Sequence, residues 1–166
     1  MLKQNIKNTH SLNDIKISTV YSGIKNKSSK EDDLLLIEFA NDANIAGVFT
    51  KSLTSSAPVN QCKHNIKSSK PPSVRAIIVN SGNANAFTGK AGDKTVFKIS
   101  TYLSKKLSCN INQIYIASTG VIGEQLNSKI IINGIDKMKP SEAPNWLKAA
   151  NAIRTTDTFS KLISRK

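Results

Sequence analysis

The sequence IYIASTGVIG, at residues 114–123, constrains the fold more than any other stretch of this chain. Its first four residues are β-branched, aromatic or small, which predicts a short strand buried on both faces. Ser118, Thr119 and Gly120 follow, and three small residues of this kind predict that the strand ends in a turn. A threonine hydroxyl and a glycine N–H that converge on one point can also stabilise a developing oxyanion. The local sequence leaves both interpretations open, a plain turn or an oxyanion site.

Other apolar runs predict further strands. LLLIEF (34–39) and RAIIVN (75–80) each predict a buried strand. IAGVFT (45–50) predicts another strand, and the Asn and Asp residues at 41, 42 and 44 predict a turn before it. The runs 34–39 and 45–50 would then pair as an antiparallel hairpin. The first thirty residues are polar and predict loops, with a turn at Ser22 and Gly23.

Apolar residues at helical spacing predict three amphipathic helices, over residues 93–107, 128–138 and 146–153. Pro58 is expected to end the small, polar stretch that precedes it. We therefore expect a mixed α/β fold in a single domain over residues 1–166, a length sufficient for one hydrophobic core.

The sequence SGNANA (81–86) directly follows the predicted strand 75–80. Asn and Gly adopt left-handed backbone conformations readily, and Asn side chains bond the nearby backbone, so this stretch predicts a tightly hydrogen-bonded loop. The spacing of its glycines matches neither a phosphate-binding loop nor a dinucleotide fingerprint. Two roles remain open, support for the floor of an active site or a simple strand-to-helix connection.

The net charge of +13 raises the question of nucleic-acid binding. Of the 24 basic residues only Arg75, Arg154 and Arg165 are arginine, and the lysines are scattered without interleaved aromatic residues. This distribution is not typical of a base-stacking or phosphate-reading surface. We therefore expect no nucleic-acid partner, although a basic nucleic-acid-binding protein stays as the least favoured alternative.

Cysteine and histidine are too few for the commonest metal and triad sites. Cys62 and Cys109 lie far apart, and His10 and His64 have no partners at ligand spacing. We expect no metal, no cofactor and no Ser-His-Asp triad, so any acyl chemistry would use a base other than histidine. No apolar run approaches the length of a membrane span and the N-terminus has no signal-like apolar segment, so we expect a cytoplasmic protein without a membrane partner.

Four motifs occur in order and in register with those of one enzyme family. They are AGVFTKSLTSSAPV (46–59), RAIIVNSGNANAFTG (75–89), ASTGVIGE (117–124) and TTDTFSK (155–161). Together they resemble the bifunctional ornithine acetyltransferase / N-acetylglutamate synthase family (glutamate N-acetyltransferases) of arginine biosynthesis. The resemblance covers residues 18–161, and four motifs in register make it specific.

This resemblance implies a layered α/β/β/α sandwich, of which this chain would hold an incomplete part. Members of the family are made as a precursor that cleaves itself before a threonine, and the two resulting chains stay together, in an α2β2 heterotetramer. The freed threonine takes the acetyl group from N-acetylornithine, or from acetyl-CoA in bifunctional members, and passes it to glutamate. Such an N-terminal nucleophile needs no histidine. Thr119 and Gly120 would correspond to the oxyanion hole, and Thr156 to a substrate-binding threonine.

The sequence departs from the family pattern at its end. In the family, a Gly-rich segment with a lysine and the nucleophilic threonine follows TTDTFxK, and this sequence stops at Lys166 before it. We therefore expect an α-chain-like portion without a nucleophile, whose β-chain half is its partner. The alternative is a non-catalytic remnant of the same fold that serves at most as an interaction module.

Overall fold

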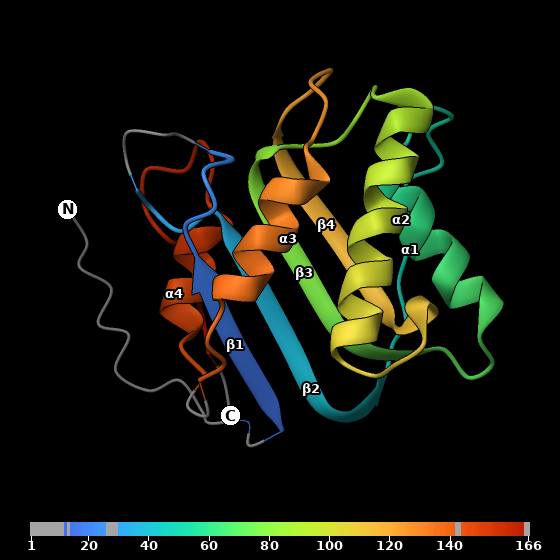
Figure 1. Ribbon diagram of the computed structural model, residues 1–166, viewed down its shortest axis with the longest axis horizontal. Helices are drawn as coiled ribbons and strands as arrows, with labels where there is room; N and C mark the ends of the chain where they lie inside the picture. Colours follow the sequence, from blue (N-terminus) through green and yellow to red (C-terminus); the bar gives the residue numbers. More distant parts are fainter. Residues whose placement is uncertain (1–11, 13, 26–29, 142–143, 165–166) are drawn as a thin grey trace.

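A computed structural model describes residues 12, 14–25, 30–141 and 144–164, and it shows a four-stranded sheet flanked by helices (Figure 1). The strands lie across the sheet in chain order, β1 (Ile15–Val20), β2 (Leu34–Asn44), β3 (Ser73–Asn83) and β4 (Ile114–Val121). The pairs β1–β2 and β2–β3 are antiparallel, whereas β3–β4 is parallel. The helices are α1 (Ala57–Ser68), α2 (Gly89–Lys106), α3 (Ser128–Lys137) and α4 (Trp146–Ala152), and the 3₁₀ turn η1 (Ile111–Gln113) precedes β4. The predicted mixed α/β class is confirmed.

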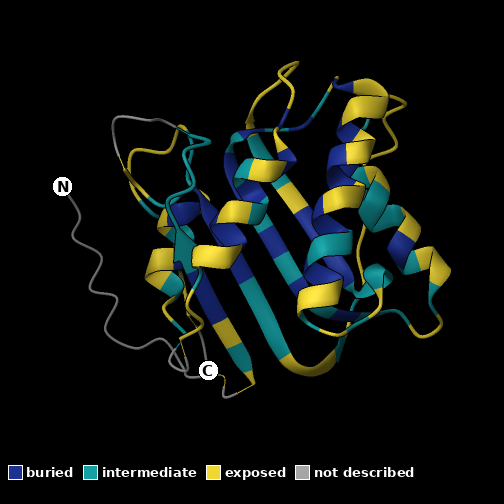
Figure 2. Ribbon diagram, viewed as in Figure 1, coloured by how far each residue is buried: buried dark blue, intermediate teal, exposed yellow. Residues whose placement is uncertain are grey.

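The two faces of the sheet are covered differently. Helices α1, α2 and α3 pack on one face, where the main core gathers the buried residues Leu34, Ile78, Ile99, Ile114 and Ile131, and Figure 2 shows buried residues along the strands beneath them. On the other face, α4 covers β1 and β2 through a smaller cluster, Ile17, Leu35, Ala149 and Ala152. The described residues form one sheet, so the second sheet layer of the expected sandwich is not among them.

The hairpin predicted from residues 34–39 and 45–50 is wrong. Both flanks of β2 are already occupied, by β1 and by β3, and residues 45–50 form no strand, with Val48 fully exposed at 100%. The polar residues at 41, 42 and 44, predicted as a turn, extend β2 instead. A shift in register between Glu38 and Ala43 accommodates them, as a β-bulge does. The strands predicted over 34–39 and 75–80 are confirmed, and each is longer than its apolar run.

Two elements went unpredicted, β1 and α1. Strand β1 lies in the polar N-terminal part, where its short IKIS alternation is the only signal. Pro58 does not end the segment before it but lies in the first turn of α1, which begins at Ala57; proline is favoured there because its missing N–H has no helical partner to lose. The helices predicted at 93–107, 128–138 and 146–153 are confirmed as α2, α3 and α4, with Asn127 capping α3.

The prediction that Ser118, Thr119 and Gly120 end the last strand is also wrong. Strand β4 continues through all three residues to Val121, because β3 runs beside it and pairs with it along the same length. Nor is the start of the strand buried throughout, since Ala117 is exposed. The pairing with a neighbouring strand outweighs the local preference of small residues for a turn.

Side chains of α1 close the outer edge of β4. The Gln61 amide donates to the Ile114 carbonyl (2.6 Å) and accepts from the Ile116 N–H (3.3 Å), as a neighbouring strand would. The Asn65 amide also donates to the Ile114 carbonyl (2.8 Å), and the Cys62 thiol donates to the carbonyl of Ile116 (3.4 Å). The strand edge is therefore satisfied by side chains as far as Ile116.

We expect the variant Gln61→Ala to destabilise the chain. The Ile116 N–H then lacks its hydrogen-bond partner, which should lower the free energy of unfolding by roughly 1–3 kcal/mol. Urea unfolding checks this against Asn60→Ala, an exposed change one residue away on the same helix that should alter stability little. Equal midpoints for the two variants would show that the edge does not need the glutamine.

Candidate active site

The carboxyl-terminal ends of β3 and β4 bring the candidate residues together. Asn80 lies opposite Ser118, Ser81 opposite Thr119, and Gly82 opposite Gly120 in the parallel register. Both strands end at the same edge of the sheet, and in open α/β sheets ligands commonly bind where parallel strands end. The sequence-predicted pair Thr119 and Gly120 thus lies at the edge that this general rule favours.

The backbone at Gly120 adopts a conformation that requires glycine. Its φ is +132°, and a Cβ on it would lie 2.3 Å from the carbonyl carbon of Gly82 and 2.6 Å from the amide nitrogen of Asn83. The two strands are therefore in direct backbone contact at this point. Gly120 must lack a side chain for that contact to form.

From the alternation of backbone groups along β4 we infer that the N–H of Gly120 points away from β3. Along β4 the N–H and C=O of Ile116 face outward, to α1, and the Val121 carbonyl faces β3, where it accepts from the N–H of Ala84 (2.8 Å). Because the direction of these groups alternates along a strand, the N–H of Gly120 faces outward too. The hydrogen bonds from α1 to the outer side of β4 stop at Ile116, so this donor lies on the part of that side that α1 does not cover. Gly120 is exposed and Thr119 is half-buried.

A hydrogen-bonded loop supports the ends of the two strands. Asn83 accepts from the N–H of Asn85 (2.8 Å) and donates to the carbonyl of Glu124 (3.1 Å), and the Gly123 N–H donates to the carbonyl of Ala86 (2.9 Å). Asn85 has a φ of +45°, which confirms the left-handed conformation expected of this stretch. The loop therefore joins β3 and β4 beyond Gly120, and this favours the supporting role over a plain connection.

A buried carboxylate that was not predicted from the sequence, Asp33, binds the backbone of residues 22–25. Asp33 is fully buried (0% exposed) and accepts from the N–H groups of Gly23 (2.9 Å), Ile24 (2.6 Å) and Lys25 (3.1 Å), and from both the N–H and the hydroxyl of Ser22. The segment it holds packs on Gly82, where a Cβ would lie 2.4 Å from the Cα of Lys25. Asp33 carries no local sequence signal of this role, because its partners are set by the loop that precedes it.

Thr156 lies after α4, on an exposed segment. The end of α4 is fixed to the candidate site, because the Ser81 hydroxyl donates to the carbonyl of Ala152 (2.7 Å) and Ser81 pairs with Thr119. Thr156 comes four positions after Ala152 in the chain, a span of at most about 14 Å. The segment that holds Thr156 therefore begins near Thr119 and Gly120, but among the described residues no hydrogen bond joins Thr156 to either of them.

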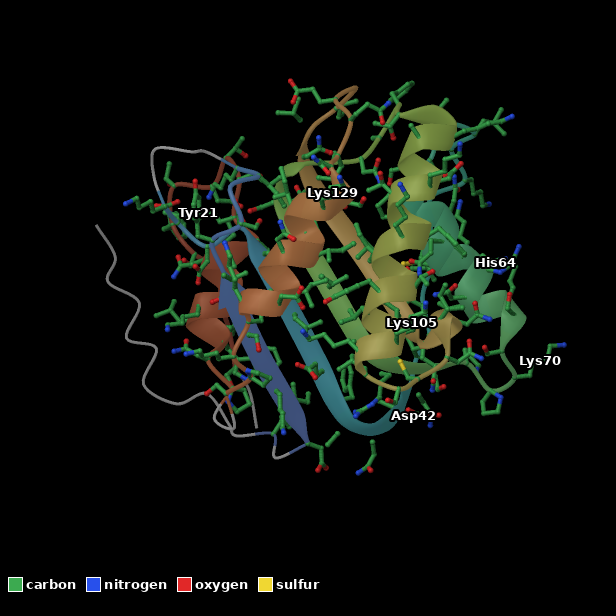
Figure 3. All side chains as sticks on the ribbon, viewed as in Figure 1. Tyr21, Asp42, His64, Lys70, Lys105 and Lys129 are labelled. Carbon is green, nitrogen blue, oxygen red and sulfur yellow. The ribbon has the colours of Figure 1, made fainter. Side chains whose placement is uncertain are left out.

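The cysteine and histidine of α1 make no hydrogen bond to Thr119 or Gly120 among the described residues, and the Cys62 thiol bonds β4 further back, at Ile116. Burial raises the pKa of the Cys62 thiol, which keeps it protonated and a poor nucleophile at neutral pH. His64 lies on the outer side of α1 (Figure 3). In the part of the chain that the structure describes, no group of three or more His, Cys, Asp or Glu residues could hold a metal ion, and no helix has the length and apolar character to cross a membrane.

Three lysines that Figure 3 labels lie at separate places on the molecule. Lys70 follows α1, Lys105 lies near the end of α2 and Lys129 near the start of α3, at three separate places (Figure 3). Lys106 pairs with Asp136 (2.7 Å) and Lys161 with Asp157 (2.6 Å), so part of the positive charge is balanced locally.

Comparisons with known proteins agree on one family. The model of the ArgJ family matches residues 16–166. An arginine biosynthesis bifunctional protein ArgJ from Bartonella henselae is 46% identical over the full length of this chain, and one from Rhizobium meliloti is 40% identical over 93% of it. The chain spans 40% and 36% of the lengths of these two relatives.

Two solved structures share the fold. A crystal structure of arginine biosynthesis bifunctional protein argJ from Bacillus halodurans matches with a TM-score of 0.80 and 30% identity, covering 91% of this chain and 81% of that chain. Ornithine acetyltransferase from Mycobacterium tuberculosis, crystallised with ornithine, matches with a TM-score of 0.72 and 31% identity, covering 87% of this chain and 77% of that one.

Proposed function

The chain belongs to the ArgJ family, and on this premise we propose that it is the α-chain-like portion of a glutamate N-acetyltransferase. The completed enzyme, meaning this chain together with the downstream half of an ArgJ protein, would transfer an acetyl group from N-acetylornithine to glutamate in arginine biosynthesis. Acetyl-CoA is a second acetyl donor in this proposal, as a substrate and not as a resident cofactor. We place the enzyme in the cytoplasm.

The observation that carries the proposal is the end of β4. Thr119 and Gly120 lie side by side at the edge of the sheet, with the Gly120 N–H directed outward. Backbone contact with Gly82 fixes this geometry before any substrate binds. Preorganised donors of this kind stabilise an oxyanion because they need no reorganisation as the charge develops.

We assign each residue one step. A threonine hydroxyl of the downstream half attacks the acetyl carbonyl, and its proton passes to the α-amino group of the same residue. The negative charge that develops on the carbonyl oxygen is stabilised by the Thr119 hydroxyl and the Gly120 N–H. The intermediate collapses to an acetyl-threonine and expels ornithine, whose amine takes up the proton. The α-amino group of glutamate then attacks the acetyl-threonine, and the same two donors act again. The intermediate releases N-acetylglutamate, and the threonine hydroxyl re-forms with the proton that the amine gives up. Thr156 contacts the acetylated amino acid in this proposal.

The proposed partner is the downstream half of the same enzyme. The chain covers 81% of the solved chain from Bacillus halodurans but only 40% of the curated Bartonella henselae sequence, so that solved chain is about half as long. This difference supports a family enzyme built from two chains, which we propose assemble as α2β2. Apolar side chains of Val48, Leu53 and Ile122 are exposed, with Val48 and Leu53 fully so, and a partner chain would cover them.

We expect purified residues 1–166 alone to transfer no acetyl group from N-acetylornithine to glutamate. The reason is that the proposed nucleophile belongs to the downstream half and no residue of this chain replaces it. The assay follows labelled acetyl-glutamate in a preparation from a host that lacks its own enzyme. Turnover by this chain alone would contradict the proposed division of roles.

A further inference from the structure

Asn80 is a buried polar residue whose two hydrogen bonds lie beside the candidate oxyanion pair. It is 1% exposed and lies on the face of β3 that the main core covers, one register position before Thr119. Its carbonyl oxygen accepts from the Ser118 hydroxyl (2.6 Å), and its amide nitrogen donates to the carbonyl of Asn83 (2.8 Å). The side chain therefore joins a residue of β4 to a residue further along β3.

The residues that these two hydrogen bonds join to Asn80 flank the backbone contact between Gly82 and Gly120. Ser118 immediately precedes Thr119, and Asn83 immediately follows Gly82, whose backbone contacts Gly120. A shift of either strand end would break one of the bonds. An apolar residue of similar size would leave the Ser118 hydroxyl and the Asn83 carbonyl without this partner, and a carboxylate could not donate to that carbonyl.

We propose that Asn80 is a positioning residue that holds Thr119 and Gly120 in place through Ser118 and Asn83. It contacts no reacting atom. Its effect on catalysis rests on the proposed function of the oxyanion pair, whereas its effect on the end of β4 can be measured in this chain by itself.

The test is amide hydrogen exchange of the full chain, followed residue by residue by NMR. Removing the amide with Asn80→Ala, or the serine hydroxyl with Ser118→Ala, should speed exchange of the Thr119 and Val121 amides, which face β3, by about tenfold. The Tyr115 amide, at the start of the same strand, should keep its rate. Ser118→Thr keeps a hydroxyl and should restore slow exchange at Thr119.

Asn65→Ala is the matched control. Asn65 is also a buried asparagine (2% exposed) that bonds β4, but at Ile114. It should speed exchange near Tyr115 and leave Thr119 unchanged. If Asn80→Ala does not fold, Ser118→Ala decides the question, because Ser118 is half-buried and its loss removes one bond. An equal change at Tyr115 and Thr119 would mean a global loss of stability and would overturn the proposal, as would no change at Thr119.

A kinetic measurement separates this proposal from the proposed function. In the completed enzyme, Ser118→Ala should lower kcat by about tenfold with little change in KM, since a displaced donor acts mainly in the transition state. Faster exchange at Thr119 with an unchanged kcat would uphold the positioning role of Asn80 and contradict the oxyanion role of Thr119.

Discussion

Replacing Thr119 by alanine in the completed enzyme is expected to lower kcat by about 10²–10³-fold, the usual effect of removing one oxyanion donor. The hydroxyl stabilises charge that exists only in the transition state and the intermediate, so KM should change far less than kcat. Steady-state kinetics with N-acetylornithine and glutamate measure both constants. Thr119 is only half-buried, and the backbone pairing of its strand with β3 does not depend on its side chain. The variant should therefore stay folded, and unfolding would not explain such a loss of activity.

Two further variants serve as controls for that result. Thr119→Ser keeps the hydroxyl and should keep most of the activity. Thr156→Ala should instead raise KM for the acetylated amino acid with a smaller effect on kcat, because a ground-state contact acts on substrate and transition state alike. A Thr119→Ala enzyme within a few-fold of the parent would leave these residues with a structural role only.

Substituting Gly120 by alanine is expected to be among the most damaging single changes in the chain. Alanine at a φ of +132° is strained, and its Cβ would lie 2.3 Å from a backbone carbon of Gly82 that no side-chain rotation can move. Strain of this kind alone costs roughly 1–3 kcal/mol, and the collision adds to it by forcing β3 and β4 apart. Urea unfolding of the chain should therefore show a large loss of stability.

Gly123→Ala is the matched comparison. Gly123 also has a positive φ, +86°, but a Cβ there would meet nothing within 4 Å. It should show the strain without the collision, and so a clearly smaller loss of stability than Gly120→Ala. If the two variants unfold at the same urea concentration, the contact between Gly82 and Gly120 does not hold the strand ends together.

The sequence predicted well the elements that carry their own pattern. Helices α2 and α3 show a complete apolar stripe, and the start of β2 and the centre of β3 are continuous apolar runs. Their extensions were not predictable from local sequence, because polar residues such as Asp42 become part of a strand only when a partner strand lies alongside.

The candidate site shows the same limit in a sharper form. Ser118, Thr119 and Gly120 have the composition of a turn, and only the pairing with residues 80–83 of β3 makes them a strand. The loop at Asn85 was predictable, since asparagine itself favours the left-handed conformation found there. The clamp at Asp33 was not, because a single buried carboxylate has no pattern in the sequence. The roles assigned to Thr119, Gly120 and Thr156 come from the family resemblance, and the geometry adds the direction of the Gly120 N–H.

The most direct measurement of the central claim is acetyl transfer by the reconstituted enzyme. This chain and the downstream half of the Bartonella henselae relative are assayed separately and as a purified complex, with N-acetylornithine and glutamate. We expect no transfer by either half and turnover by the complex, and Thr119→Ala in this chain should lower the kcat of the complex by about 10²–10³-fold. Turnover by one half alone, or a folded complex that transfers no acetyl group, would contradict it.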